Sequence, residues 1–141
     1  PPLRIAGLVL EASICYEDGY ASSRLPVLEE ATALVNVTND AWFGPSFGGR
    51  QHFALGRLRA VETGRWLLRA GNDGITASVD PFGRVVAEIP PHQEGFLLAP
   101  YALRTGLTPY ARFGDWAVGL ALTIFLLGLI LRVRPPGWRN R

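Results

Sequence analysis

The stretch Ala12-Ser13-Ile14-Cys15-Tyr16-Glu17-Asp18 marks the point where an apolar run ends on the only cysteine of the chain and charged residues follow at once. The preceding residues, Leu3 to Leu10, are apolar enough to predict a buried strand. Such a strand delivers the residue after it to the edge of a sheet, where catalytic groups are often found. This position makes Cys15 the candidate nucleophile.

A helix and a second strand are predicted next. Apolar residues at spacings of three predict an amphipathic helix from Leu25 to Leu34. Ser22 or Ser23 is placed to cap it, and Pro26 falls in its first turn. The branched residues from Leu34 to Thr38 predict a strand. Because strand, helix and strand in succession form a parallel crossover, the pattern indicates an α/β fold.

The segment from Asn39 to Arg50 mixes Gly, Asn, Asp and Pro with three aromatic residues, which indicates an ordered loop whose rings need burial or a ligand. Gln51 to Trp66 returns to helical spacing and is predicted to cover the sheet. Arg59 and Glu62 are spaced for an ion pair on this helix, and Arg65 follows at the same interval. The apolar face predicted for this helix consists of Ala54, Leu55, Leu58 and Val61.

Three further strands are predicted from Trp66 to Ala70, Ile75 to Val79 and Arg84 to Ile89. Turn sequences separate them, so we expect an antiparallel meander. Phe96 to Ala99 is a shorter possible strand, and Tyr101 to Arg112 is predicted to be an irregular connector.

The length of 141 residues is enough for one domain with an appendage but not for two ordinary domains. The formal charge of +2 is small and comes from arginines near the C-terminus, so we expect no nucleic-acid partner. His52 and His92 lack metal-ligand spacing and are interpreted as ordinary core or surface residues. We expect neither a metal nor another cofactor. The chain lacks methionine altogether, which suggests that it is a fragment.

Residues 116–131 carry no charge, and extension to residues 113–133 brings the segment to the roughly 17 to 25 residues that a transmembrane helix needs. Arginines dominate residues 134–141, so the positive-inside rule predicts a cytoplasmic tail and an extracytoplasmic folded part. The alternative is a buried core helix at the end of a soluble domain.

A lone cysteine is by default a small buried hydrophobic residue, and a nucleophilic one needs a nearby base or positive charge. Glu17 and Asp18, the neighbours of Cys15 in the sequence, are both acidic and would oppose formation of the thiolate. We therefore expect any activating group to come from elsewhere in space or from sequence outside this chain.

Six ordered blocks of the sequence resemble the bacterial apolipoprotein N-acyltransferases of the nitrilase superfamily. The similarity covers nearly the whole chain, and the predicted terminal span favours the acyltransferases over the soluble amidases of that superfamily. The blocks are Ile14-Cys15-Tyr16-Glu17, residues 35–44 (VNVTNDAWFG), residues 57–65 (RLRAVETGR), residues 69–77 (RAGNDGITA), residues 80–84 (DPFGR) and residues 104–112 (RTGLTPYAR).

The resemblance implies an α/β fold in which residues 1–112 form the C-terminal half of a nitrilase-like αββα domain, followed by one C-terminal transmembrane helix, residues 113–133, and a basic tail. It implies a bacterial inner-membrane enzyme with a periplasmic domain. That enzyme would move an acyl chain from a phospholipid to the N-terminal amine of a diacylated apolipoprotein cysteine. The alternatives are a membrane-anchored amidase of the superfamily and a non-catalytic membrane-tethered fragment.

The resemblance also assigns roles to residues. Cys15 matches the family nucleophile, which would form a thioester acyl-enzyme in a ping-pong reaction. The backbone N–H of Tyr16 is a candidate oxyanion donor, with packing as the alternative role of its side chain. Glu17 matches a supporting position, with a solvated charge as the alternative.

Three residues of the predicted loop, Asn39, Trp42 and Phe43, match the family's active-site loop, where the aromatic rings would line the entry for acyl chains or simply cap the core. The family's catalytic Glu and Lys lie upstream of the cysteine, and this chain contains no lysine at all. The chain alone is therefore expected to be inactive.

Overall fold

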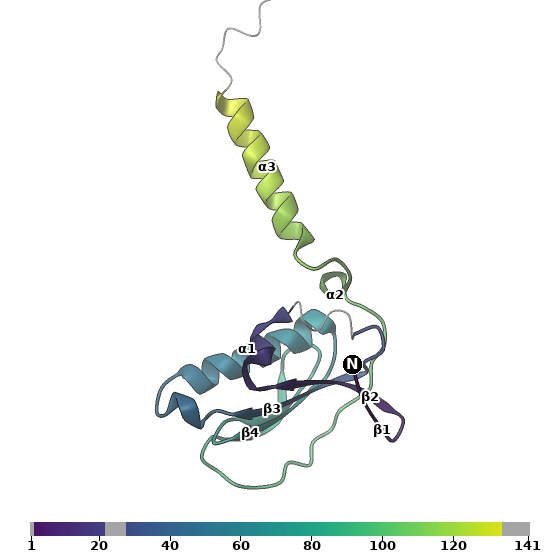
Figure 1. Cartoon of the computed structure of the whole chain (residues 1–141), viewed down its shortest axis with the longest axis vertical. Coiled ribbons are helices and arrows are strands. Elements are labelled where there is room, and N and C mark those ends of the chain that lie inside the picture. The colour runs from purple at the N-terminus through teal and green to yellow at the C-terminus, as the bar shows by residue number, and fades with distance from the viewer. Residues whose placement is uncertain (1, 22–27, 134–141) are drawn as a thin grey trace, which may run out of the picture.

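The computed structural model describes residues 2–21 and 28–133, and its centre is a six-stranded mixed sheet with the strands in sequence order (Figure 1). The α/β class is confirmed. The strands are β1 (Leu3–Ile5), β2 (Leu8–Ile14), β3 (Ala33–Asn39), β4 (Leu67–Asn72), β5 (Thr76–Val79) and β6 (Val85–Ile89). The helices are α1 (Gly48–Thr63), α2 (Pro109–Phe113) and α3 (Trp116–Val133), and two short 3₁₀ helices are η1 (Cys15–Gly19) and η4 (Ala41–Phe43).

The first predicted strand is in fact two strands joined by a tight turn. Ala6 and Gly7 have φ angles of 48° and 81°, and this left-handed pair reverses the chain so that β1 runs antiparallel to β2. The side chains of Leu3 and Ile5 on β1 are exposed, so the prediction of one buried strand from Leu3 to Leu10 was wrong. The prediction that Cys15 follows a strand directly is confirmed by β2.

The parallel crossover is confirmed, because β2 pairs in parallel with β3 and β3 pairs in parallel with β4. The predicted strand from Leu34 to Thr38 lies within β3. Residues 22–27, with the predicted cap and Pro26, lie outside the described residues.

The predicted crossover helix is wrong over residues 28–32, which form turns and bends. A helix there would need the Leu28 carbonyl to accept from the Thr32 N–H. Instead the Thr32 N–H donates to the Val9 carbonyl at 2.7 Å, and the Leu28 carbonyl accepts from the Arg65 guanidinium at 3.2 Å. Arg65 also donates to the Ala31 carbonyl, and burial lowers its pKa.

Helix α1 covers one face of the sheet and confirms the predicted helix, although it begins and ends three residues earlier (Figure 1). The predicted apolar face was wrong: Ala54, Leu58 and Val61 are exposed. The helix instead buries a mixed face, because the sheet beneath it carries polar side chains. The buried residues are His52, Phe53, Gly56, Arg59, Ala60 and Thr63. The apolar part of the core consists of Leu28, Leu34, Phe53, Ala60, Leu67, Ala77, Val79 and Ala111.

The antiparallel meander is confirmed by β4, β5 and β6. Phe96 to Ala99 is not a strand, since Phe96 and Leu98 are almost completely exposed and pair with no sheet edge among the described residues. The connector is irregular up to α2, which Thr108 caps by accepting a hydrogen bond from the Ala111 N–H.

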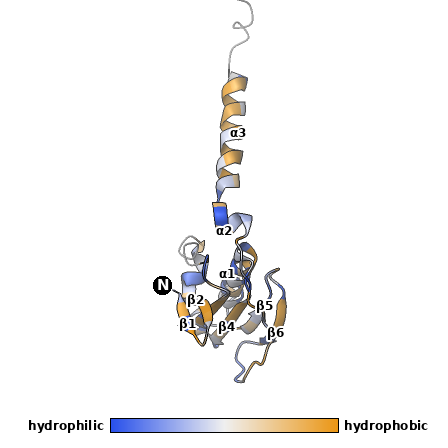
Figure 2. Cartoon of the chain, turned by 90° about the vertical axis from the view of Figure 1, so that its right-hand side faces the viewer, coloured by the Kyte–Doolittle hydropathy of each residue, from blue (hydrophilic) through white to orange (hydrophobic). Residues whose placement is uncertain are grey.

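Helix α3 extends away from the sheet and is mostly hydrophobic along its length (Figure 2). Its large apolar side chains from Trp116 to Leu131 are exposed. Within residues 2–21 and 28–133 no helix is both long and apolar enough to cross a membrane, so the predicted span over 113–133 is not supported. Phe113 belongs to α2, and Gly114, with a φ angle of 57°, separates it from α3. At 1.5 Å per residue, the remaining helix is about 27 Å long, against about 30 Å for a bilayer core. The predicted tail, residues 134–141, lies outside the described residues.

Candidate active site

A row of polar side chains crosses the three parallel strands beneath α1. Ser13 on β2 is the register partner of Asn36 on β3, and Asn36 is the register partner of Arg69 on β4. All three are at most 2% exposed. The Asn36 amide donates to the Ser13 hydroxyl at 2.9 Å, and its oxygen accepts from Arg69 Nη1 at 3.1 Å. The strands therefore bring a connected polar row across the sheet, starting one residue before the end of β2.

Cys15 lies at the end of this row, as the residue after β2 and the first residue of η1. Its φ angle is 51°, in the left-handed region that non-glycine residues seldom adopt and that costs of order 1–3 kcal/mol. Its side chain is half-buried. The backbone therefore changes direction sharply at the cysteine, and surrounding contacts must fix the strained conformation.

Two buried side chains bind the Cys15 carbonyl oxygen. Asn36 Nδ2 donates to it at 3.3 Å, and His52 Nε2 lies 3.1 Å away. Because a carbonyl oxygen can only accept, Nε2 must carry a proton. The two donors come from β3 and α1, so the turn at Cys15 is tied to both layers of the fold.

Arg69 is the charged centre beneath this turn. Its Nη1 lies 3.2 Å from Asp18 Oδ2 on η1, and its Nη2 lies 3.0 Å from Asp40 Oδ2. The side chains of all three residues are at most 1% exposed. A planar guanidinium can bind two carboxylates at once, which one ammonium cannot do with the same geometry. Arg69 therefore neutralises Asp18, the second of the two acidic residues that follow Cys15 and Tyr16.

His52 connects this charged centre to the cysteine. Its Nδ1 lies 2.8 Å from Asp40 Oδ1 and 3.2 Å from Arg69 Nη2. Its ring stacks on Tyr16, with the centroids 5.4 Å apart, and Phe43 packs against it at 5.7 Å. The imidazole thus has polar neighbours at both nitrogens and aromatic rings of Tyr16 and Phe43 packed against it.

Two glycines allow helix α1 and the turn between β4 and β5 to lie close to this cluster. A Cβ added to Gly56 on α1 would lie 2.8 Å from Asp18 Oδ2, and one added to Gly74 would overlap the carboxylate of Asp40. Neither position leaves room for a real side chain. Glycine at these positions therefore lets α1 and the β4–β5 turn close over the buried charges.

The predicted site residues Tyr16 and Glu17 lie beside Cys15 on η1. The Tyr16 ring is about half-exposed, and it contacts Tyr20 as well as His52. The exposed carboxylate of Glu17 accepts the Ile14 N–H at 2.7 Å, across the start of η1. Glu17 therefore links the backbone on the two sides of Cys15.

The predicted loop residues are only partly brought to the cluster. Phe43 packs on His52, whereas Trp42 is 85% exposed and contacts no member of the polar row in the described structure. Asn39 accepts the Ala41 N–H and the Asn72 amide, so it links η4 to the end of β4. The expectation that these aromatic rings need burial or a ligand is met within the chain only by Phe43.

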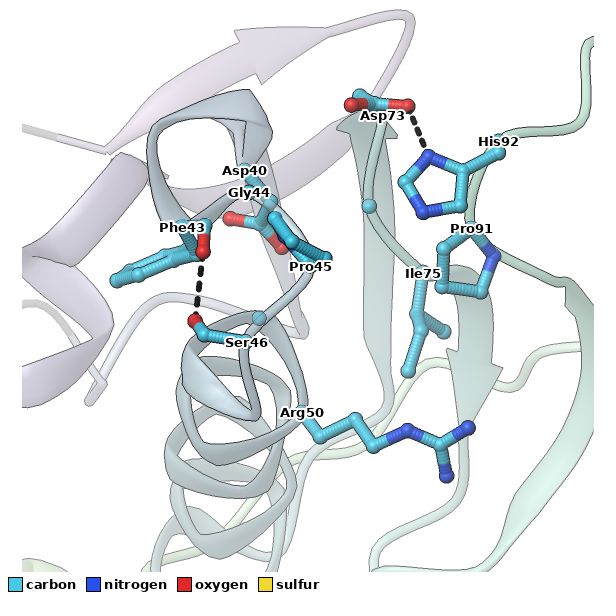
Figure 3. A pocket seen from close by; sticks show the side chains of 12 residues that line it. Asp40, Phe43, Gly44, Pro45, Ser46, Arg50, Asp73, Ile75, Pro91 and His92 are labelled. Carbon is cyan, nitrogen blue, oxygen red and sulfur yellow. Dashed lines mark hydrogen bonds and ion pairs between the residues drawn. The ribbon is translucent and has the colours of Figure 1, made fainter.

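A pocket of about 320 Å³ opens on the far side of Asp40 and Phe43 (Figure 3). Its walls come from the loop before α1, the β4–β5 turn and the segment around His92, whose Nδ1 lies 2.5 Å from Asp73 Oδ1. Cys15 does not line it. Among residues 2–21 and 28–133, no three His, Cys, Asp or Glu side chains gather as metal ligands would.

Most of the buried cluster was missed from the sequence. The missed residues are Ser13, Asp18, Asn36, Asp40, His52 and Arg69. A usable signal existed, because each of the three strands carries a polar residue at this level, namely Ser13, Asn36 and Arg69. Aligning the three strands as parallel neighbours would have placed these residues side by side.

The sequence profile described as carbon-nitrogen hydrolase matches residues 1–106. The chain is 50% identical over 123 residues to an apolipoprotein N-acyltransferase of Methylococcus capsulatus, covering 86% of this chain and 24% of that protein. It is 39% identical over 141 residues to an apolipoprotein N-acyltransferase of Pseudomonas aeruginosa, covering 99% of this chain and 28% of that protein. The chain thus spans about a quarter of the length of these curated relatives.

Two crystal structures share the fold at low sequence identity. A carbon-nitrogen hydrolase from Helicobacter pylori matches with a TM-score of 0.58 and 13% identity, over 66% of this chain and 40% of that one. An amidase from Nesterenkonia sp. matches with a TM-score of 0.55 and 18% identity, over 86% of this chain and 46% of that one. These likenesses bear out the nitrilase-like α/β fold.

Proposed function

This chain belongs to the carbon-nitrogen hydrolase family, and from that membership we propose that it carries the nucleophile of an apolipoprotein N-acyltransferase. The observation that carries the proposal is the half-buried Cys15, strained at the end of a parallel strand and tied by its carbonyl to a buried polar cluster. The names of the relatives at 39–50% identity supply the reaction class and the lipoprotein substrate.

The proposed chemistry is a two-step acyl transfer at Cys15. The thiolate sulfur attacks the carbonyl carbon of a phospholipid ester, a C–S bond forms, and the ester C–O bond breaks to release a lysophospholipid that takes up a proton. The N-terminal amine of a diacylated apolipoprotein then attacks the thioester. An amide bond forms, the C–S bond breaks, and the amine loses a proton as the thiolate is restored.

Two residues beside the nucleophile would support these steps. The backbone N–H of Tyr16 is one of the first donors of η1, and such donors have no partner within their own helix. We propose that it stabilises the oxyanion formed on the acyl carbonyl, a type of contact worth roughly a hundred- to a thousandfold in rate. Glu17 would hold the start of η1 in place through the Ile14 N–H.

We propose no residue of this chain as the general base. The family resemblance implies a Glu and a Lys that no residue here matches, and the chain contains no lysine. We therefore propose that activity needs the full natural polypeptide and that residues 1–141 alone do not turn over.

We further propose that the reaction takes place at the surface of the bacterial inner membrane. An acyl donor of this class resides in lipid, and α3 presents exposed apolar side chains from Trp116 to Leu131. Contact of these side chains with lipid would remove a large apolar area from water, at about 25 cal/mol per Å². Which side of the membrane the domain occupies remains a prediction from the sequence.

The test is to trap the acyl-enzyme in the full-length protein. Incubation with phospholipid vesicles should add one acyl chain to the peptide that contains Cys15, and neutral hydroxylamine should remove it. Cys15→Ala should carry no adduct, and Cys15→Ser should carry none that hydroxylamine removes easily. An unmodified Cys15 in a folded, lipid-supplied enzyme would refute the proposal, and turnover of short aliphatic amides instead would point to an amidase.

A further inference from the structure

We propose that His52 is a positioning residue that aims the Tyr16 backbone N–H at the reacting carbonyl. The inference rests on the proposed acyl transfer at Cys15 and adds a residue that does not touch the substrate. It follows from the contacts of His52 with the backbone that joins Cys15 to Tyr16.

The Cys15 carbonyl and the Tyr16 N–H belong to one peptide unit. A peptide unit is planar and trans, so its C=O and its N–H point in opposite directions. The carbonyl oxygen is bound from the interior by Asn36 and His52. The Tyr16 N–H must therefore point away from the buried cluster, and we place the reacting acyl carbonyl on that side.

His52 is itself immobile, which makes it a suitable support. It is 1% exposed, its Nδ1 is bound to Asp40, and Asp40 in turn accepts from Thr38 Oγ1 at 3.0 Å and from Arg69. Rotation of the imidazole about its last bond would break the Asp40 and Cys15 contacts together. The direction of the Cys15 carbonyl is thus set by a chain of buried contacts that begins on β3 and β4.

His52 restrains Tyr16 in a second way that Asn36 does not. The ring of Tyr16 stacks on the imidazole at an angle of 29° between the planes. One side chain therefore fixes both the peptide that precedes Tyr16 and the side chain of Tyr16. The hydrogen bond of Asn36 to this segment, by contrast, goes to the Cys15 carbonyl alone, at the longer distance of 3.3 Å.

Two conservative variants separate the contacts of the two ring nitrogens. The amide nitrogen of His52→Asn occupies the place of Nδ1 and can still bind Asp40, but it does not reach the Cys15 carbonyl. The amide nitrogen of His52→Gln takes the place of Nε2 and can donate to that carbonyl. Both variants keep a polar side chain in the buried site, so neither leaves the cluster wholly unpartnered.

The experiment measures two rate constants in the full-length protein. The first is acylation of Cys15 by phosphatidylethanolamine vesicles and, separately, by p-nitrophenyl butyrate. The second is alkylation of the same thiol by iodoacetamide, a reaction with no carbonyl oxyanion. His52→Asn should slow acylation about tenfold or more and leave alkylation within about twofold, whereas His52→Gln should acylate within about threefold of wild type. His92→Asn, at the exposed second histidine, should change neither rate.

Two results would overturn the inference. Equal acylation by the Asn and Gln variants would show that the Cys15 contact does not matter, and parallel loss of acylation and alkylation would show a structural role only. A wild-type enzyme that reacts with the nitrophenyl ester but not with phospholipid would refute the proposed function instead. In that case the ester rates still decide the role of His52.

Discussion

Arg69 and Asp18 form an ion pair that is completely excluded from solvent, with Nη1 3.2 Å from Oδ2 and no exposed area on either side chain. The pair joins β4 to the first turn after Cys15. Buried pairs contribute little net stability when complete, but loss of one partner leaves an uncompensated charge in the interior. The pair therefore makes the folding of this region dependent on both residues together.

Replacement of Arg69 by Met should destabilise the protein strongly. It would leave the carboxylates of Asp18 and Asp40 buried without their shared cation, which we expect to cost about 3–5 kcal/mol in free energy of unfolding. Chemical denaturation monitored by tryptophan fluorescence measures the loss. Glu30→Gln, which breaks the exposed pair with Arg4, is the matched control and should cost no more than about 1 kcal/mol. Equal losses in the two variants would contradict the prediction.

The left-handed backbone of Cys15 predicts an unusual order of stability for two variants of this residue. Cys15→Gly should be more stable than Cys15→Ala by about 1 kcal/mol, because glycine adopts a φ angle of 51° without strain. The same pair of substitutions at Leu58, an exposed position within α1, should give the opposite order, since alanine is the better helix former by about 1 kcal/mol. Denaturation midpoints of the four variants test this, and the same order at both positions would argue against strain at Cys15.

The strands from β3 to β6 and the position of Cys15 directly after a strand could be predicted from the sequence because they depend on local patterns. Runs of branched residues mark β3, and turn sequences separate β4, β5 and β6. The parallel pairing of β2 with β3 was also predicted correctly, although the crossover helix expected from Leu25 to Leu34 is absent over the described residues 28–34, the last two of which begin β3. There the missing information was a long-range contact, the donation from Arg65 to carbonyls of the crossover segment.

The buried cluster could not be predicted from composition or periodicity. Helical periodicity assigns apolar residues to the core, so it placed Leu58 and Val61 inside and left His52 without a role. The opposite arrangement arises because the polar row on β2, β3 and β4 requires polar partners from the helix above it. Only the register of the strands reveals that requirement. The functional expectation for Cys15 therefore came from sequence motifs, whereas the residues around it came from the fold.

Gly56 is predicted to be essential for the close packing of α1 on η1. Gly56→Ala should destabilise the protein by about 1–3 kcal/mol despite the better helix propensity of alanine, because the new methyl group would meet the Asp18 carboxylate. That carboxylate cannot withdraw, since Ser13 and Arg69 bind it. Gly119→Ala in α3 is the control, as a Cβ there meets nothing within 4 Å. A thermal unfolding midpoint unchanged in Gly56→Ala would show that the two layers can separate without cost.

Glu62 on α1 gives a prediction about pH. Burial raises its pKa above the ordinary value of 4.5 and outweighs the nearby charge of Arg59, and the charge of Asp115 raises it further. Between pH 4.5 and the raised pKa, the unfolded state loses this proton while the folded state keeps it. The stability that Glu62 contributes is therefore fully present below pH 4.5 and is lost as the pH rises through the raised value.

Wild type should accordingly lose stability relative to Glu62→Gln as the pH rises above 4.5, and the difference should level off once Glu62 is ionised in both states. Denaturation midpoints measured for both proteins from pH 4 to pH 7.5 give this difference directly. Asp115→Asn should narrow the pH range over which the stability difference between wild type and Glu62→Gln develops, because this substitution removes one of the charges that raise the Glu62 pKa. A difference between wild type and Glu62→Gln that stays constant with pH would mean that the ion pair with Arg59, at 2.9 Å, fully offsets the burial of the carboxylate.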